Sequence, residues 1–386
     1  MNPSDFPNPS GRLLKVEQDN RTYWAFVPDP LPPAVGLGAS LVRALSDADR
    51  ALGELAGLGR AIPNPHLLIG PFTRREAVLS SRIEGTQADI AAVYAYEAGA
   101  LKNRDTDARE VVNYVRAMDH GLQRLAELPV GLRLIRELHT HLMEGVRGGA
   151  AAPGEFRRVQ NYIGRPGCTV ETADFVPPPV SQMIPALEDW ETYLHTDDGN
   201  PPLVRLAYIH YQFETIHPFL DGNGRIGRLL IPLLLMEWNL LPLPLLYLSA
   251  FFEKHRGDYY DLLLAVSQRS AWEDWLLFFL RGVEEQARDA IVRARRLQDL
   301  QRQWRERLQT RPYTAASLLK LVDELFAAPT VTVPQVQAIL GVTHRAANQT
   351  VMRLVEEGVL VAVPGRARNR QFVAQAIVDV LTGDAE

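Results

Sequence analysis

The chain has 386 residues, of which 46% are hydrophobic, enough to bury the cores of about two or three domains. Its formal net charge of −5 gives no whole-chain argument for binding nucleic acid or an anionic membrane. The single cysteine, Cys168, excludes an internal disulfide and a multi-cysteine zinc site. Since the sequence shows neither an apolar run of membrane-spanning length nor a secretory signal pattern, we expect a cytoplasmic protein without membrane contact.

The N-terminal third predicts an extended arm followed by helices. Residues 1 to about 35 are rich in Pro, Asn and Asp, so we expect an arm that lies on the body, with a short strand at 23–27. Apolar residues then recur with helical spacing through most of the chain. The predicted helices cover 39–58, 72–99, 107–128, 130–146, 180–194, 253–266 and 271–309. The fold class is therefore expected to be mainly α.

One predicted helix holds a serine and a glutamate four residues apart. Ser80 and Glu84 lie on the same helical face, and Gly85 indicates a break or kink directly after them. Taken by itself, this pattern indicates a solvated helix carboxylate. Further along, His139 and His141 are two residues apart and point to different sides of a helix, so we interpret them as structural.

A turn-rich stretch interrupts the helices between 154 and 179. Short β-prone runs, including Asn161, Tyr162, Ile163 and Gly164, are joined by Gly and Pro. This pattern predicts a small β-hairpin, and a surface loop is the alternative.

The strongest chemical signal is the twelve-residue string from His217 to Arg228, HPFLDGNGRIGR, which apolar segments flank on both sides. We expect a helix to end near His217 and another to start near Gly222. The glycines let successive N–H groups converge on an anion, and the first turn of the second helix adds more donors. Arginines suit phosphate oxygens, a carboxylate suits Mg²⁺, and histidine accepts a proton near neutral pH. The string thus indicates a site for phosphoryl or nucleotidyl transfer.

At every specified position this string also matches the pattern His-x-Phe-x-Asp/Glu-Gly-Asn-Gly-Arg-x-x-Arg, so the chain resembles the Fic domain family. The resemblance implies transfer of AMP from ATP, with Mg²⁺, to a protein hydroxyl. It implies that His217 is the general base, that Asp221 holds the metal and that Arg228 binds the γ-phosphate. The implied nucleotide-binding residues are Gly222, Asn223, Gly224, Arg225, Gly227 and Arg228.

The resemblance gives further stretches a meaning. Ser80-x-x-x-Glu84-Gly85 is similar to the inhibitory motif of autoinhibited Fic proteins, which implies that Glu84 pairs with Arg228 and blocks productive ATP binding. Residues 161–164 would belong to the flap that binds the target by strand addition. Tyr259 and Tyr260 either stack on adenine or belong to the core.

The last part of the chain resembles a winged helix. Helices are expected at 315–328, 333–340 and 345–357, followed by strands at 359–363 and 371–373. Arg366, Arg368 and Arg370 would form a basic wing, and residues near His344 could reach base edges. Winged helices also serve in dimerisation, so DNA binding is not favoured. We divide the chain into an N-terminal arm and inhibitory region, 1–106, a Fic catalytic domain, 107–310, and a winged-helix domain, 311–386.

The leading hypothesis is an autoinhibited protein adenylyltransferase that modifies Ser, Thr or Tyr of target proteins and of itself and releases pyrophosphate. One alternative uses the same site to remove AMP, with Glu84 positioning water. Another is a DNA-binding regulator whose Fic body senses nucleotide. Homodimerisation stays open.

Overall fold

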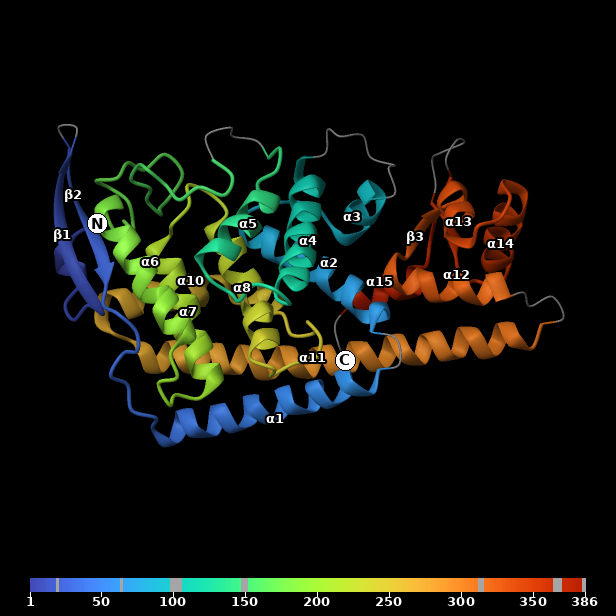
Figure 1. The fold of residues 1–386 in the computed structure, drawn as a ribbon, viewed down its shortest axis with the longest axis horizontal. Helices are drawn as coiled ribbons and strands as arrows, with labels where there is room; N and C mark the ends of the chain where they lie inside the picture. The colour runs from blue at the N-terminus through green and yellow to red at the C-terminus, as the bar shows by residue number, and fades with distance from the viewer. Residues whose placement is uncertain are drawn as a thin grey trace.

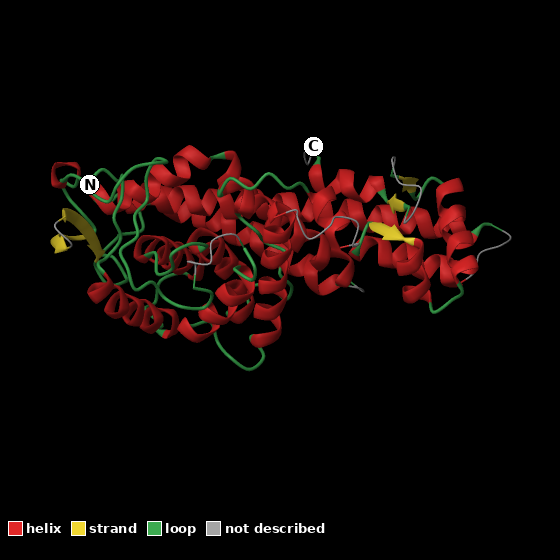
Figure 2. Ribbon diagram, turned by 90° about the horizontal axis from the view of Figure 1, so that it is seen from above, coloured by secondary structure: helices red, strands yellow, loops and turns green. Residues whose placement is uncertain are grey.

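The computed structural model describes residues 1–18, 21–62, 65–97, 106–146, 152–311, 316–363 and 370–383. Helices make up most of these residues, and the strands are confined to two small antiparallel sheets near opposite ends of the molecule (Figure 2). The predicted mainly α fold class is confirmed. No helix within these ranges is long and apolar enough to cross a membrane.

The longest helix, α11 (Trp272–Gln309), runs along the whole molecule, with α1 (Ala39–Ala61) packed beside it (Figure 1). Its N-terminal half buries aromatic and aliphatic side chains at helical spacing, including Trp275, Phe279 and Val283. Its C-terminal half extends past the body and carries the C-terminal unit, as the figure shows. The sequence prediction of one long helix here is confirmed.

Two consecutive helices, α7 (Pro202–Ile216) and α8 (Asn223–Glu237), lie in the middle of the core. Both are buried almost all round, by apolar residues and by a set of buried polar ones that includes His210, Arg225 and Arg228. Further helices pack around this pair and complete the body: α4 (Thr106–Arg124), α5 (Leu132–Leu142), α6 (Val180–His195), α9 (Ser249–Lys254) and α10 (Arg256–Arg269). The short connection between α7 and α8 is therefore held on a rigid support.

Helix α2 (His66–Ile83) threads between α4, α8 and α9. It begins six residues before the predicted start at Phe72. It ends at Glu84, and Gly85 adopts φ +99°, so the predicted break is confirmed. A separate short helix, α3 (Ile90–Glu97), follows it.

The N-terminal arm contains more β-structure than predicted. After a 3₁₀ turn (Pro3–Asp5), strands β1 (Gly11–Gln18) and β2 (Arg21–Pro28) form an antiparallel hairpin of eight paired residues each. The hairpin lies against the turn-rich stretch: Phe26 N–H donates to Val176 O at 2.9 Å, and Tyr23 packs with Val170 and Ala173. The prediction of a single strand was incomplete. The hairpin is stabilised by a distant segment that covers the apolar side of β2, and no local pattern reveals that segment.

The hairpin predicted over 154–179 is reduced to one antiparallel bridge between Ile163 and Phe175. The described residues around it are turns and irregular loop. This prediction was wrong in extent because prolines and glycines interrupt ladder pairing: Gly164, Pro166 and Gly167 lie between the bridge partners, and three prolines follow at 177–179. This stretch is held in place by hydrogen bonds of its side chains, which the next subsection describes, rather than by strand pairing.

The C-terminal unit follows the order helix, strand, helix, helix, strand, strand, helix. Its elements are α12 (Ala316–Ala327), β3 (Thr330–Thr332), α13 (Val333–Leu340), α14 (His344–Glu356), β4 (Val361–Ala362), β5 (Gln371–Val373) and α15 (Gln375–Thr382). The strands form an antiparallel sheet in the order β3-β5-β4. The sequence had predicted neither β3 nor α15. Arg366 and Arg368 lie outside the described residues, whereas Arg370 lies over the ring of Phe372.

Candidate active site

The loop between α7 and α8 folds around two residues in the left-handed region. His217 ends α7 with φ +50°, and Gly222 precedes α8 with φ +80°. Between them the Asn223 side chain accepts from Phe219 N–H and donates to Phe219 O, both at 2.8 Å. The Asn223 side chain therefore closes the loop, and only its backbone N–H can serve the anion site expected here.

The tautomer of His217 is set by the backbone. Its Nδ1 lies 3.1 Å from Glu214 O, and because a carbonyl oxygen only accepts, Nδ1 carries the proton. Nε2 is left with a free lone pair. Burial lowers the pKa of His217 to about 4, with Arg157 adding to the shift, so the ring is neutral at physiological pH. A half-buried neutral imidazole of this kind can accept a proton.

Three side chains fix this loop from outside. Buried Arg157 donates to His217 O at 3.0 Å and to Pro178 O at 2.5 Å. Asn161 donates to His217 O and Phe219 O, at 3.1 and 2.9 Å. His139 stacks on Phe219 with ring centroids 3.8 Å apart, and its Nε2 lies 3.0 Å from Asp221 O. No sequence pattern had pointed to Arg157. Asn161 was predicted to belong to the target-binding flap, and in the structure its side chain supports the loop.

Arg228 and Glu84 form an ion pair across the site. Glu84 Oε1 accepts from Arg228 Nη2 at 2.7 Å. Ser80 holds the same guanidinium twice, through Oγ at 2.9 Å and its carbonyl O at 3.0 Å. Burial opposes ionisation of both side chains, but the attraction between them raises the pKa of Arg228 and lowers that of Glu84. The structure thus brings together the three residues that the Ser-x-x-x-Glu pattern and the central motif singled out.

The Glu84 carboxylate lies directly against the first turn of α8. A Cβ built on Gly224 would be 2.4 Å from Glu84 Oε1 and 2.8 Å from Arg228 Nη1, so only glycine admits the carboxylate here. The first N–H groups of a helix attract anions, and α8 has no side-chain cap. A carboxylate therefore sits at the helix end where the sequence predicted a phosphate.

Arg225 lies on the same side with Asp221 and Glu110. Its guanidinium is 3.4 Å from Asp221 Oδ1 and 3.4 Å from Glu110 Oε2, and its Nε is buried without a hydrogen-bond partner among the described residues. A buried donor left unpaired suits a bound anion. No sequence pattern pointed to Glu110, which reaches the site from α4.

The acidic groups here suit a metal carried in with a substrate. Within the described ranges, no cluster of three or more His, Cys, Asp or Glu could enclose a metal ion. Asp221, with its side chain 56% exposed at the mouth of the loop, is one carboxylate able to bind one. Mg²⁺ is commonly held by one or two carboxylates together with phosphates and water, so Asp221 fits that role.

The two predicted tyrosines have different surroundings. Tyr259 is 1% exposed, and its hydroxyl lies 2.9 Å from Nε2 of His210. Its ring is stacked on Phe252, which leaves it no open face for a nucleotide base. Tyr259 therefore belongs to the core, the alternative left open by the sequence, whereas Tyr260 is 39% exposed.

A carboxylate that the sequence analysis did not select is also buried beside the site. Glu214 Oε1 is buried with no hydrogen-bond partner among the described residues and lies against Gly227, whose Cβ would be 2.2 Å away. Burial, with a contribution from Glu84, raises the pKa of Glu214 to about 7. Gly227 thus makes room for a side chain and need not contact a nucleotide.

Helix α2 is anchored by polar groups in the core. Glu76 accepts from Ser249 Oγ at 2.5 Å and from Tyr114 OH at 3.2 Å, and all three are buried. One turn earlier, Thr73 bonds Tyr247 OH at 3.0 Å. Dissociation of this helix as a route to activity would therefore break a buried polar network.

Parts of the chain match models of one protein family. Residues 42–123 match the Fic/DOC family N-terminal model, and residues 129–235 match the Fic/DOC family model. Protein adenylyltransferase Fic of Drosophila grimshawi is 32% identical over 139 residues, 36% of this chain and 25% of that protein. The same-named protein of Drosophila persimilis is 26% identical over 217 residues, 56% of this chain and 39% of that protein.

A solved structure of a Fic family protein from Desulfovibrio desulfuricans G20 aligns with TM-score 0.57 at 20% identity, covering 89% of this chain and 98% of that one. This likeness concerns the fold. The chain spans between a quarter and two fifths of the length of the two curated relatives. Together the matches support a Fic family protein.

Proposed function

We propose that the chain is an autoinhibited protein adenylyltransferase that transfers AMP from ATP to Ser, Thr or Tyr hydroxyls of target proteins and of itself. The observation that carries the proposal is the position of Glu84: its carboxylate pairs with buried Arg228 and lies against the uncapped first turn of α8. The named relatives are protein adenylyltransferases, which supports the same chemistry.

In the proposed reaction, Nε2 of His217 takes the proton of the target hydroxyl. The hydroxyl oxygen then forms a bond to the α-phosphorus of ATP, the bond from that phosphorus to the bridging oxygen breaks, and pyrophosphate leaves. The α8 N–H groups and Arg225 stabilise charge on the phosphates. Mg²⁺, when bound with ATP at Asp221, neutralises phosphate charge. Arg228 receives the γ-phosphate once Glu84 moves away.

The surroundings of the loop support a target site beside His217. Tyr162 and Ile163 are exposed apolar side chains, 43% and 39%, next to the residues that hold the His217 loop. We propose that a target segment lies along this stretch, with its backbone paired to the chain near the Ile163–Phe175 bridge. Tyr260, rather than Tyr259, is proposed to contact the adenine.

AMP removal is a second candidate, because Glu84 contributes to the electrostatic environment of His217 and keeps 37% of its side chain exposed. Such a carboxylate can hold a water molecule beside the base. The two functions differ in what Glu84 does: it inhibits transfer but is required for hydrolysis.

We also propose that residues 311–386 form a winged-helix domain. The order α12, β3, α13, α14, β4, β5 and the antiparallel sheet support it. A salt-dependent gel shift that Arg366→Ala weakens would support DNA binding, and a salt-independent one or none would favour a protein contact.

Incubation of wild type, Glu84→Gly and His217→Ala with Mg²⁺ and ATP radiolabelled on its α-phosphate tests the main proposal. We expect label on Glu84→Gly, less on wild type and none on His217→Ala. If none of the three proteins gives any labelled product, even with a cell lysate added as a source of targets, the main proposal is wrong. Release of AMP from a modified target that requires Glu84 would establish the second candidate.

A further inference from the structure

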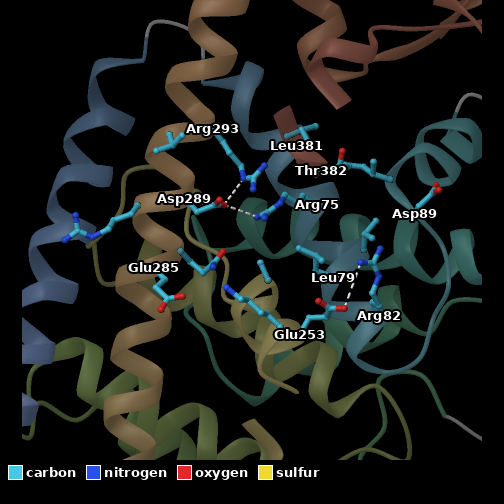
Figure 3. A pocket seen from close by; sticks show the side chains of 17 residues that line it. Arg75, Leu79, Arg82, Asp89, Glu253, Glu285, Asp289, Arg293, Leu381 and Thr382 are labelled. Atoms are coloured by element: carbon cyan, nitrogen blue, oxygen red, sulfur yellow. Dashed lines mark hydrogen bonds and ion pairs between the residues drawn. The ribbon is translucent and has the colours of Figure 1, made fainter. Parts of the chain in front are cut away.

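A cavity of about 800 Å³ lies against α2, and its lining includes none of residues 217–228 (Figure 3). Helix α2 lines it with Arg75, Leu79 and Arg82, while Glu76 and Ser80, on another face of the same helix, serve the core and Arg228. The opposite wall is α11, and Leu381 and Thr382 of α15 close one side. The cavity therefore lies where the C-terminal unit meets the Fic body.

Positive charge is in excess on its inner wall. Asp289 is shared by two arginines, with Arg293 Nε at 2.7 Å and Arg75 Nη1 at 3.3 Å, as the dashed lines of Figure 3 show. The side chain of Arg293 is 4% exposed and that of Arg75 is 20% exposed. Burial lowers the pKa of Arg75, and the positive charge of Arg293 lowers it further. The charged form of Arg75 is thus disfavoured because two cations lie beside one carboxylate.

The remaining charges of the wall leave this excess in place. Lys254, exposed on α9, has no ion-pair partner among the described residues. Glu253 lies 4.0 Å from Arg82, and Glu285 is bound by Arg281 outside the cavity. The carboxylate of Asp89 accepts from Ala92 N–H at the start of α3. The acids of the wall are thus already engaged, whereas Arg75 and Lys254 can take another anion.

We propose that this cavity binds a small molecule bearing a phosphate group or several carboxylates, and that the bound anion fixes α2 in the position that pairs Glu84 with Arg228. Paired guanidinium groups bind such anions by charge-assisted hydrogen bonds. The volume suits a metabolite on the order of a nucleotide in size. Because the anion would join α2 to α9 and α11, it would stiffen the helix that carries Ser80 and Glu84.

Binding is tested with inorganic phosphate as the probe, by calorimetry on the full chain without nucleotide. We expect Arg75→Gln and Lys254→Gln each to weaken phosphate binding at the cavity by about tenfold or more. Arg295→Gln is the matched control, because Arg295 is an exposed arginine of α11 that pairs with Glu54 outside the cavity. Arg225→Gln distinguishes phosphate bound at the N-terminus of α8 from phosphate bound in the cavity, because Arg225 lies at α8 and does not line the cavity.

If both Arg75→Gln and Lys254→Gln bind phosphate as tightly as wild type does, the proposed site is wrong. It is also wrong if Arg225→Gln is the only variant that loses phosphate binding. Since Lys254 is exposed, its variant keeps the test valid if Arg75→Gln unfolds.

The effect on α2 is tested by amide hydrogen exchange, which needs no enzymatic activity and stands apart from the proposed function. The N–H groups of Glu84 and Gly85 bond Ser81 O and Arg82 O at the end of the helix. We expect phosphate to slow exchange there in wild type and not in Arg75→Gln. Equal exchange with and without phosphate in wild type contradicts the coupling, whether or not the chain adenylylates anything.

Discussion

Glu84 and Arg228 are 2.7 Å apart but lie in different environments: the arginine side chain is 1% exposed and the glutamate side chain 37%. Ser80 makes two further hydrogen bonds to Arg228, neither of which involves Glu84. The pair is therefore asymmetric. The arginine is fixed, and the carboxylate is the member that can leave.

Replacement Glu84→Gly should raise self-labelling roughly tenfold or more, because a charge-assisted hydrogen bond of about 1.5–3 kcal/mol no longer competes with the γ-phosphate. Buried Arg228 loses a partner, so the free energy of unfolding should fall by about 1–3 kcal/mol. Radiolabel incorporation and urea denaturation measure the two effects. Glu127→Gly, which removes an exposed carboxylate paired with Arg124 at 2.6 Å, should change neither. Equal labelling of Glu84→Gly and wild type contradicts autoinhibition.

Replacement His217→Ala should abolish labelling of Glu84→Gly, since no other described side chain takes its place at the loop. With a pKa of about 4, His217 is already neutral above pH 5 and gains a proton only as the pH falls further. Protonation of His217 should therefore leave the labelling rate unchanged between about pH 5 and 7. A rate that rises tenfold through pH 6.5 would contradict the assignment of an already neutral base.

Replacement Arg157→Ala should lower the rate constant for labelling at saturating ATP, because the carbonyl of His217 loses its buried donor and the loop loosens. The expected loss of stability is about 1–3 kcal/mol. The neighbouring Arg158, whose side chain is 84% exposed and pairs with Glu155, is the matched control. If Arg158→Ala and Arg157→Ala behave alike, a positioning role for Arg157 is wrong.

Replacement Gly224→Ala in the Glu84→Gly background should weaken ATP binding and labelling, since the new Cβ points where the carboxylate now lies and crowds Arg228. Gly257→Ala is a suitable control, because a Cβ there meets nothing within 4 Å. ATP affinity by calorimetry distinguishes a blocked anion site from lost chemistry. Unchanged affinity in Gly224→Ala means that the phosphates bind elsewhere.

Acid should destabilise the fold through buried histidines. Burial lowers the pKa of His210 to about 3, so its contribution to stability is present above the unfolded value near 6.5. It is lost as the pH falls from there towards 3, at about 1.4 kcal/mol per pH unit. His210→Gln should flatten this part of the stability curve in denaturation series from pH 6.5 to 4. An unaltered slope would mean that His210 is protonated in the folded protein.

The central site was predictable because its residues are adjacent in the chain. Residues 217–228 contain the proposed base, the carboxylate proposed to bind the metal, the start of α8 and both arginines, and the contact between Glu84 and Arg228 followed from a second short pattern. The contacts of the loop with Arg157, His139 and Glu110 span 60, 82 and 115 residues of sequence, and local residue spacing does not predict contacts over such separations.

The same distinction explains the fold. Helices with strong apolar periodicity, such as α6 and α11, were predicted close to their bounds. The pairing of β1 with β2 depends on a cover supplied by Val170 and Val176, and β3 is only three residues long. Elements whose stability comes from distant partners leave little trace in their own residues.

The buried polar anchors of α2 have a consequence for how the protein would respond to its substrate. With Glu76 and Thr73 fixed in the core, the body of the helix stays in place, and only its last turn with the Glu84 side chain has to move. The ATP concentration at half-saturation of the proposed enzyme then increases by a factor equal to the reciprocal of the fraction of time that Arg228 is free of Glu84. The rate of AMP transfer would therefore stay proportional to the ATP concentration over a wider range. The protein would then respond to the energy charge of the cell gradually, instead of changing between an inactive and an active state.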